Sequence, residues 1–169
     1  MQNSILEIYN KEKKLLKELE KYYFEVGVFE DKAQRKKKKR KKQQESKNKD
    51  ITNLELMTIH EYGSPVKGIP KRPILKITIT HNKINKYVEE TIERCEDIIW
   101  NGGTEDDFVK VLKQAALYIE SFAKELVMTG KARIKANKPA TIKAKKSSLP
   151  LIDTGELIKS IVCVVNKHN

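Results

Sequence analysis

Apolar residues recur every three or four positions along two adjoining stretches in the middle of the chain, which is the period of an α-helix. Asn101-Gly102-Gly103 separates the stretches, and Thr104 with Asp107 has the spacing of a capping box that starts a second helix. The pattern therefore predicts an antiparallel helical hairpin. Its buried positions are Ile84, Tyr87, Val88, Thr91, Ile92, Cys95, Ile98 and Ile99 in the first helix, and Phe108, Val111, Leu112, Ala115, Ile119, Phe122 and Leu126 in the second.

The same period predicts two further helices. Residues 4–22 form an amphipathic helix, and residues 50–62 form a short helix that Gly63 ends. Asp50, Thr52 or Asn53 is its N-cap. Its candidate core residues are Leu54, Met57, Ile59 and Tyr62. Residues 65–73, with three prolines, predict a stiff extended connection, and residues 74–80 fit either a strand or the start of a long helix.

Two short stretches favour strands. Residues 24–29 alternate with a period of two around Gly27, where a glycine permits a bulge or a close backbone approach. Residues 160–165 are rich in β-branched side chains. The predicted fold is α+β, with a small antiparallel sheet of these two strands packed on the long two-helix hairpin.

The 169 residues predict a single domain over 1–169, and the net charge of +12 is concentrated in two segments. A basic insertion at 31–50 projects from the body with eleven basic and three acidic residues, and a basic extended arm at 130–149 has seven basic residues and no acid. Such segments point to a polyanion or an acidic partner. The candidate DNA- or partner-binding residues are Arg35, Lys36, Lys37, Lys38, Lys39, Arg40, Lys41, Lys42, Lys131, Arg133, Lys135, Lys138, Lys143, Lys145 and Lys146.

Catalytic and cofactor patterns are lacking. His60-Glu61 begins a zinc-protease motif, but Ser64 stands where the second histidine is required. His81 and His168 are isolated, Cys95 and Cys163 have no metal or redox spacing, and the acidic group at 105–107 is typical of a helix start. We expect no enzyme activity, no metal and no cofactor. Without an apolar segment of about 18 residues or a signal core, we expect synthesis in the cytosol and no membrane association.

The stretch from Pro150 to Ile161 predicts a rigid corner. Pro150 restricts the backbone, Asp153 and Glu156 have the spacing of a helix cap, and Gly155 keeps the turn free of a Cβ. A short helical turn then leads into the second strand.

Together, three pieces in a fixed order resemble the tail-completion or head–tail joining proteins of tailed bacteriophages, the virion-morphogenesis neck family. The pieces are residues 59–75, the helical hairpin and residues 136–161. The chain departs from the family at Ile74, which is often aromatic there, and in the Lys/Arg run, which is not recognised as a family feature. The matching residues are His60, Glu61, Tyr62 and Gly63; Ile69, Pro70, Arg72 and Pro73; Lys138, Pro139, Thr141 and Ile142; and Pro150, Leu151, Asp153, Thr154, Gly155 and Leu157.

The resemblance implies a non-enzymatic structural virion protein at the phage neck, assembled in the host cytoplasm. It would form a homo-oligomeric ring of six- or twelve-fold symmetry between a portal or head-connector protein and tail-terminator or tail-tube proteins. The segment 67–73 and the arm 130–149 would reach adjacent subunits, and genomic DNA in the channel would be a non-specific contact. The alternative is a nucleic-acid-binding protein that contacts phosphates through residues 31–50.

Overall fold

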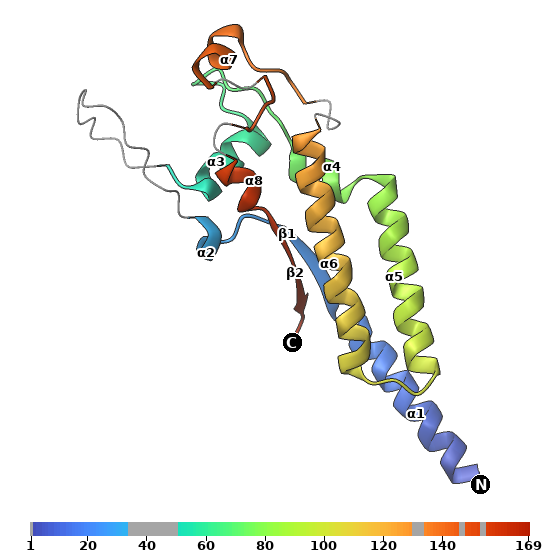
Figure 1. Cartoon of the computed structure of the whole chain (residues 1–169). Coiled ribbons are helices and arrows are strands. Elements are labelled where there is room, and N and C mark those ends of the chain that lie inside the picture. Colours follow the sequence, from blue (N-terminus) through green and yellow to red (C-terminus); the bar gives the residue numbers. More distant parts are fainter. Residues whose placement is uncertain (1, 34–50, 130–133, 146–147, 153–154) are drawn as a thin grey trace. The chain divides into compact units, whose positions relative to one another are not determined.

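A computed structural model of the chain describes residues 2–33, 51–129, 134–145, 148–152 and 155–169. The architecture is α+β, with helices and one two-stranded antiparallel sheet, as the sequence predicts (Figure 1). The described elements are α1 (Gln2–Leu19), β1 (Tyr22–Gly27), α2 (Glu30–Ala33), α3 (Asn53–Tyr62), α4 (Ile74–Ile79), α5 (Asn82–Trp100), α6 (Glu105–Met128), α7 (Pro139–Lys145), α8 (Glu156–Lys159) and β2 (Val162–Lys167).

The chain forms two compact units, each assembled from separate stretches of sequence. Unit 1 contains Met1–Val26, Thr78–Phe122 and Cys163–Asn169, whereas unit 2 contains Gly27–Ile77 and Ala123–Val162. Within each unit, segments far apart in the sequence must therefore be joined by tertiary contacts. A single domain over 1–169, with the 31–50 insertion, stays a prediction.

The helical hairpin is confirmed as α5 and α6, which lie side by side and antiparallel in Figure 1. A Cβ on Gly103 would stand 2.4 Å from Ile98 Cγ2 and 2.7 Å from the Ile98 carbonyl oxygen, so only glycine fits this turn. The predicted cap is also present, since the backbone N–H and the hydroxyl of Thr104 both donate to Asp107 Oδ2, at 3.1 and 2.7 Å. These bonds and the Lys110 ammonium lower the pKa of Asp107 to about 2.

The core of unit 1 is centred on Phe108 of α6, which is fully buried. Tyr22 of β1 meets the Phe108 ring edge to face at a centroid distance of 5.7 Å. Cys95 is a core residue, as predicted, and burial raises the pKa of its thiol to about 11. The residues of this core cluster and those packed against it come from α1, β1, α5, α6 and β2, and include Leu15, Leu16, Leu19, Tyr22, Phe24, Cys95, Ile98, Ile99, Val111, Leu112 and Val165.

The two predicted strands are present, but both are displaced by two residues from the predicted ranges. β1 begins at Tyr22 because that ring joins the core, and β2 begins only at Val162 because Ser160 still belongs to the end of α8. The Ser160 N–H donates to the Glu156 carbonyl and its hydroxyl to the Leu157 carbonyl. The close approach expected at Gly27 is absent, since a Cβ there would meet no described atom within 4 Å.

Residues 74–80 form neither a strand nor the start of α5. α4 is a separate helix that ends before His81, and His81 Nδ1 accepts a hydrogen bond from the Lys83 N–H at 3.2 Å as the N-cap of α5. The arm at 130–149 is not wholly extended either, because it contains α7. Thr52 is the N-cap of α3 and forms a reciprocal capping box with Glu55.

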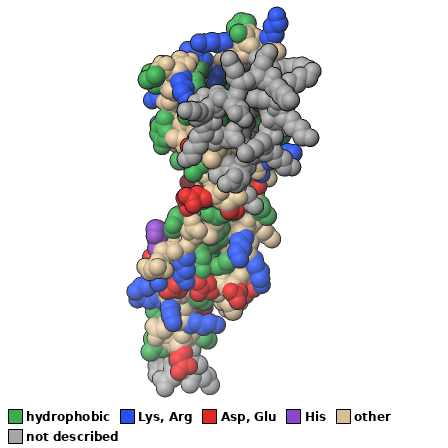
Figure 2. All heavy atoms as spheres, turned by 90° about the vertical axis from the view of Figure 1, so that its left-hand side faces the viewer, with side chains coloured by type: hydrophobic (Ala, Val, Ile, Leu, Met, Phe, Trp, Pro, Cys, Tyr) green, Lys and Arg blue, Asp and Glu red, His purple; other side chains and the backbone are tan. Residues whose placement is uncertain are grey.

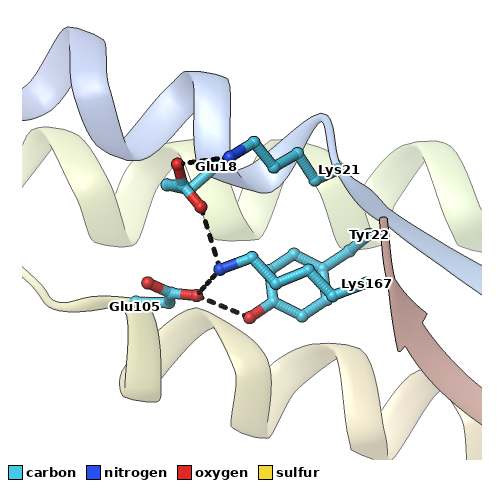
Figure 3. A network of polar contacts seen from close by, with 5 residues as sticks. All are labelled: Glu18, Lys21, Tyr22, Glu105 and Lys167. Carbon is cyan, nitrogen blue, oxygen red and sulfur yellow. Dashed lines mark hydrogen bonds and ion pairs between the residues drawn. The ribbon is translucent and has the colours of Figure 1, made fainter. Parts of the chain in front are cut away.

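A polar network in unit 1 joins the end of β2 to α1 and to the start of α6 (Figure 3). Lys167 Nζ lies 2.8 Å from Glu18 Oε2 and 2.6 Å from Glu105 Oε1, and the Tyr22 hydroxyl donates to the same Glu105 oxygen at 2.6 Å. Lys21 donates to the other Glu18 oxygen at 2.8 Å. Hydrogen bonds from Lys167 and then Lys21 lower the pKa of Glu18 to about 2, and bonds to Glu105 and Glu18 raise the pKa of Lys167.

We therefore predict that acid weakens unit 1. The folded chain holds the Glu18 pKa below its ordinary value of 4.5, so the stabilisation is complete above about pH 5 and is lost as the pH falls towards 2. Glu18→Gln should flatten this part of the curve of unfolding free energy against pH, measured by urea unfolding. Glu7→Gln, on an exposed α1 residue with no ion pair among the described residues, should leave the slope unchanged. Equal slopes for wild type and Glu18→Gln would contradict the prediction.

Candidate functional site

The candidate site lies in unit 2, where α3 ends and the resemblance to the neck proteins begins. α3 buries Asn53, Met57 and His60, whereas Tyr62, expected in the core, is 70% exposed. Gly63 ends the helix with a φ of +78°. A Cβ at Gly63 would stand within 3.1 Å of Lys71 and of the Ile69 carbonyl oxygen. The glycine thus lets the end of α3 approach the segment that follows it.

The proline-containing segment after Gly63 folds back on itself instead of running extended. Ser64 and Ile69 exchange two backbone hydrogen bonds of 2.9 Å, and the Gly68 N–H donates to the Pro65 carbonyl at 3.0 Å. Gly68 has a φ of +61°, and Val66 at the tip is 98% exposed. Only residues 70–73 then continue without regular structure into α4.

Glu61 connects the end of α3 to the start of α4. Its two carboxylate oxygens accept hydrogen bonds from the N–H groups of Leu75 and Lys76, at 3.1 and 2.9 Å. These are first-turn donors that have no acceptor within their own helix. Glu61 therefore has a structural role, and Ser64 at the position of the missing metal ligand belongs to the turn.

The centre of the site is the buried side chain of Arg72, which is 6% exposed. Its Nε donates to the Lys135 carbonyl at 2.8 Å, and its Nη2 donates to the Ala136 carbonyl at 3.3 Å and to Asn137 Oδ1 at 3.2 Å. Burial lowers the pKa of this guanidinium. Arg72 thus directs most of its donors to the chain's own arm, and the contact of the segment 67–73 with an adjacent subunit stays a prediction.

His60, which precedes Arg72 in the sequence, contacts the same guanidinium. Arg72 Nη1 lies 3.5 Å from His60 Nδ1, and the Arg72 N–H donates to the His60 carbonyl at 2.6 Å. Because a guanidinium only donates, a hydrogen bond in this contact requires His60 Nδ1 as the acceptor. His60 is thus a partner of Arg72 in the folded unit.

Asn137 extends the cluster to the corner. Its side-chain amide donates to the Leu149 carbonyl at 3.1 Å while its oxygen accepts from Arg72. Beyond it, Leu151 is buried with a φ of +65°, a region that few non-glycine residues occupy. The structure places Gly155, not Asp153, at the N-cap of α8, with a φ of +78°. Asp153 and Thr154 lie outside the described residues.

Two of the three matched pieces thus meet around one side chain. Arg72 and His60 belong to the piece 59–75, and Arg72 bonds to Ala136 and Asn137 at the start of the piece 136–161. Asn137 bonds in turn to the Leu149 carbonyl, next to the corner. α8, which carries Leu157, packs against α3. Sequence analysis missed Asn137, because a single asparagine within a polar arm has no distinguishing pattern.

A cavity of about 550 Å³ borders the cluster. Its described lining includes four cationic side chains and no carboxylate, and Pro65, Ile69, Pro70 and Ala136 supply apolar walls. Figure 2 shows Lys and Arg side chains gathered with hydrophobic ones at its upper end, at the height of α7 in Figure 1. The described lining residues are His60, Pro65, Lys67, Gly68, Ile69, Pro70, Arg72, Lys135, Ala136, Asn137, Lys138 and Thr141.

Of the predicted basic residues, the structure brings Lys135 and Lys138 to this cavity and leaves Lys143 exposed on α7. Lys145 ends α7. Lys131, Arg133, Lys146 and the run from Arg35 to Lys42 lie outside the described residues, so their contact with DNA or a partner stays a prediction. Lys67, which was not among the predicted binding residues, also lines the cavity.

The remaining polar candidates of the sequence belong to unit 1. Glu105 and Asp107 take part in the Lys167 network and in the Thr104 cap, and His168 stacks on Tyr23 at a centroid distance of 4.3 Å. Across the described part of the chain, His, Cys, Asp and Glu nowhere gather in a group of three that could hold a metal ion. No described helix has the length and apolarity to cross a membrane.

Comparison with known proteins adds no family to this geometry. No family model, curated protein or solved structure matches the chain.

Removing the Arg72 guanidinium should destabilise unit 2. Arg72→Met leaves the acceptors of residues 135–137 without their donor, and we expect a loss of about 2–4 kcal/mol in unfolding free energy, measured by urea unfolding. Arg72→Lys should recover only part, because an ammonium lacks the planar fork of donors. Lys71→Met, at the exposed neighbouring position, should change stability by less than about 0.5 kcal/mol. An Arg72→Met protein as stable as Lys71→Met would rule out this role.

Proposed function

We propose that the protein is a structural subunit of the neck of a tailed bacteriophage, a ring-forming tail-completion or head–tail connector protein. The observation that carries the proposal is the meeting of two matched pieces, 59–75 and 136–161, at Arg72. Residues more than sixty positions apart, which lie in or next to the pieces that resemble the neck proteins, share one hydrogen-bonded cluster. Side chains that hold one another in place give these motifs a structural role.

The bonds of the motif residues also favour a structural role over a catalytic one. Glu61 caps α4, Gly63 permits a close approach, and Arg72 joins the arm to the end of α3. Each of these residues has a contact within unit 2 that accounts for its chemical type. We therefore propose a non-enzymatic protein.

Exposed apolar side chains supply surfaces that an assembly could cover. On α1, Ile5 and Ile8 are 69% and 57% exposed, although the same helix packs Leu15 and Leu19 into the core of unit 1. Figure 1 shows the first turns of α1 continuing past the turn between α5 and α6. Large apolar residues grouped at one end of a helix are typical of an interaction surface. We propose that copies of this chain cover this end of α1 in a six- or twelve-membered ring.

In this proposal the ring sits at the head–tail junction of the virion after assembly in the host cytoplasm. Its partners are a portal or head-connector protein on one side and tail-terminator or tail-tube proteins on the other. Genomic DNA passing through the channel would meet the basic segments without sequence preference.

Ring formation is testable with the full chain. We expect mass photometry and negative-stain images, alone or with a purified portal ring, to show six- or twelve-membered rings. Ile8→Glu should reduce the ring fraction at least tenfold, because a carboxylate would be buried in the interface. Lys14→Gln on the same helix changes the net charge equally and should leave assembly unchanged. A wild-type chain that stays monomeric and does not bind the portal ring would overturn the proposal.

A further inference from the structure

The cavity beside Arg72 has the composition of an anion-binding site. Lys67, Lys135 and Lys138 line it together with the buried Arg72, and no described lining residue carries a negative charge. Four positive charges around about 550 Å³ repel one another, and an anion placed among them would relieve that repulsion. The concentration of cations thus favours a negatively charged ligand.

The geometry of the turn brings these cations together from distant parts of the chain. Lys138 Nζ lies 3.8 Å from the point where a Cβ would stand on Gly68, so the ammonium lies next to the 64–69 turn that also carries Lys67. Gly68 has a φ of +61°, a backbone conformation that favours glycine, so this residue type fits the turn that holds Lys67 beside Lys138. Both sides of the cavity are held in place, one by the Ser64–Ile69 backbone bonds and the other by Arg72.

Arg72 itself has donor capacity left. A guanidinium has five N–H groups, and the four side-chain contacts to residues 60, 135, 136 and 137 leave one for a further acceptor. The Thr141 hydroxyl also lines the cavity and can donate. A bound anion would therefore meet flexible ammonium groups, a hydroxyl and one fixed guanidinium donor.

We propose that this cavity binds the carboxylate side chains of an acidic peptide segment of a partner protein. The apolar walls of Pro65, Ile69, Pro70 and Ala136 favour a peptide, whose side chains have methylene groups to bury there. A nucleic-acid backbone presents mainly phosphates and sugars, and the described lining contains no Phe, Tyr or Trp on which a base could stack. The proposal does not depend on the assignment to the phage neck.

The test must separate this cavity from the run at 35–42, which would attract any polyanion. We would use the full chain with Arg35–Lys42 replaced by glutamine and measure fluorescence anisotropy of a labelled hexaglutamate peptide. In this background, Lys67→Glu with Lys138→Glu should weaken binding at least tenfold, and the corresponding double change to glutamine should weaken it about threefold. Lys143→Glu, on exposed α7 outside the cavity lining, should change it less than twofold.

Three outcomes would overturn the proposal. The peptide could fail to bind once residues 35–42 are neutral, or the cavity and Lys143 variants could weaken it equally. A 20-base-pair duplex, measured in parallel, could instead lose affinity in the cavity variants while the peptide does not, which would assign the cavity to phosphates. Circular dichroism melting should show that the exposed lysine variants remain folded. If the double change of Lys67 and Lys138 to glutamate does not remain folded, the double change to glutamine takes its place in the test.

Discussion

A guanidinium removed from water must find acceptors for its N–H groups, and in unit 2 this requirement determines how the surrounding segments are arranged. Arg72 meets it mainly with the main-chain carbonyls of residues 135 and 136, the side chain of Asn137 and the ring of His60. Carbonyl oxygens carry only a partial negative charge. They therefore satisfy the N–H donors of Arg72 without neutralising the charge of its guanidinium. The end of α3, the segment before α4 and the arm before α7 therefore lie together.

Unit 1 uses charge in a different way. Lys167 and its partners Glu18 and Glu105 are partly exposed, and each ion pair of this kind contributes little in water. Their arrangement depends on the apolar core around Phe108, which brings α1, β2 and the start of α6 together. In unit 1 the core positions the charges, whereas in unit 2 one buried charge positions the backbone.

The peptide-binding proposal and the neck proposal both involve the residues around Arg72, but neither requires the other. No described carboxylate in the cavity lining balances its cations, so the site is suited to acidic side chains of a partner. Pairing of acidic and basic surfaces fixes the orientation of two partners and raises their rate of association. The proline-containing turn supplies Lys67 to this cavity, while Val66 at its tip faces solvent. The two features place a charged and an apolar contact on one short turn.

The sequence alone was sufficient to predict the hairpin, its glycine turn, the Thr104 cap, the end of α3 at Gly63 and the α+β class, because these depend on neighbours within about four residues. It could not place Arg72 inside, since its acceptors are main-chain atoms more than sixty positions away, which carry no residue identity. The start of β1 at Tyr22 and the cap that Glu61 places on α4 likewise depend on residues distant in the sequence. Local periodicity determined the elements, and only the tertiary structure decided which polar groups share a buried site, because desolvated donors must be satisfied wherever acceptors lie.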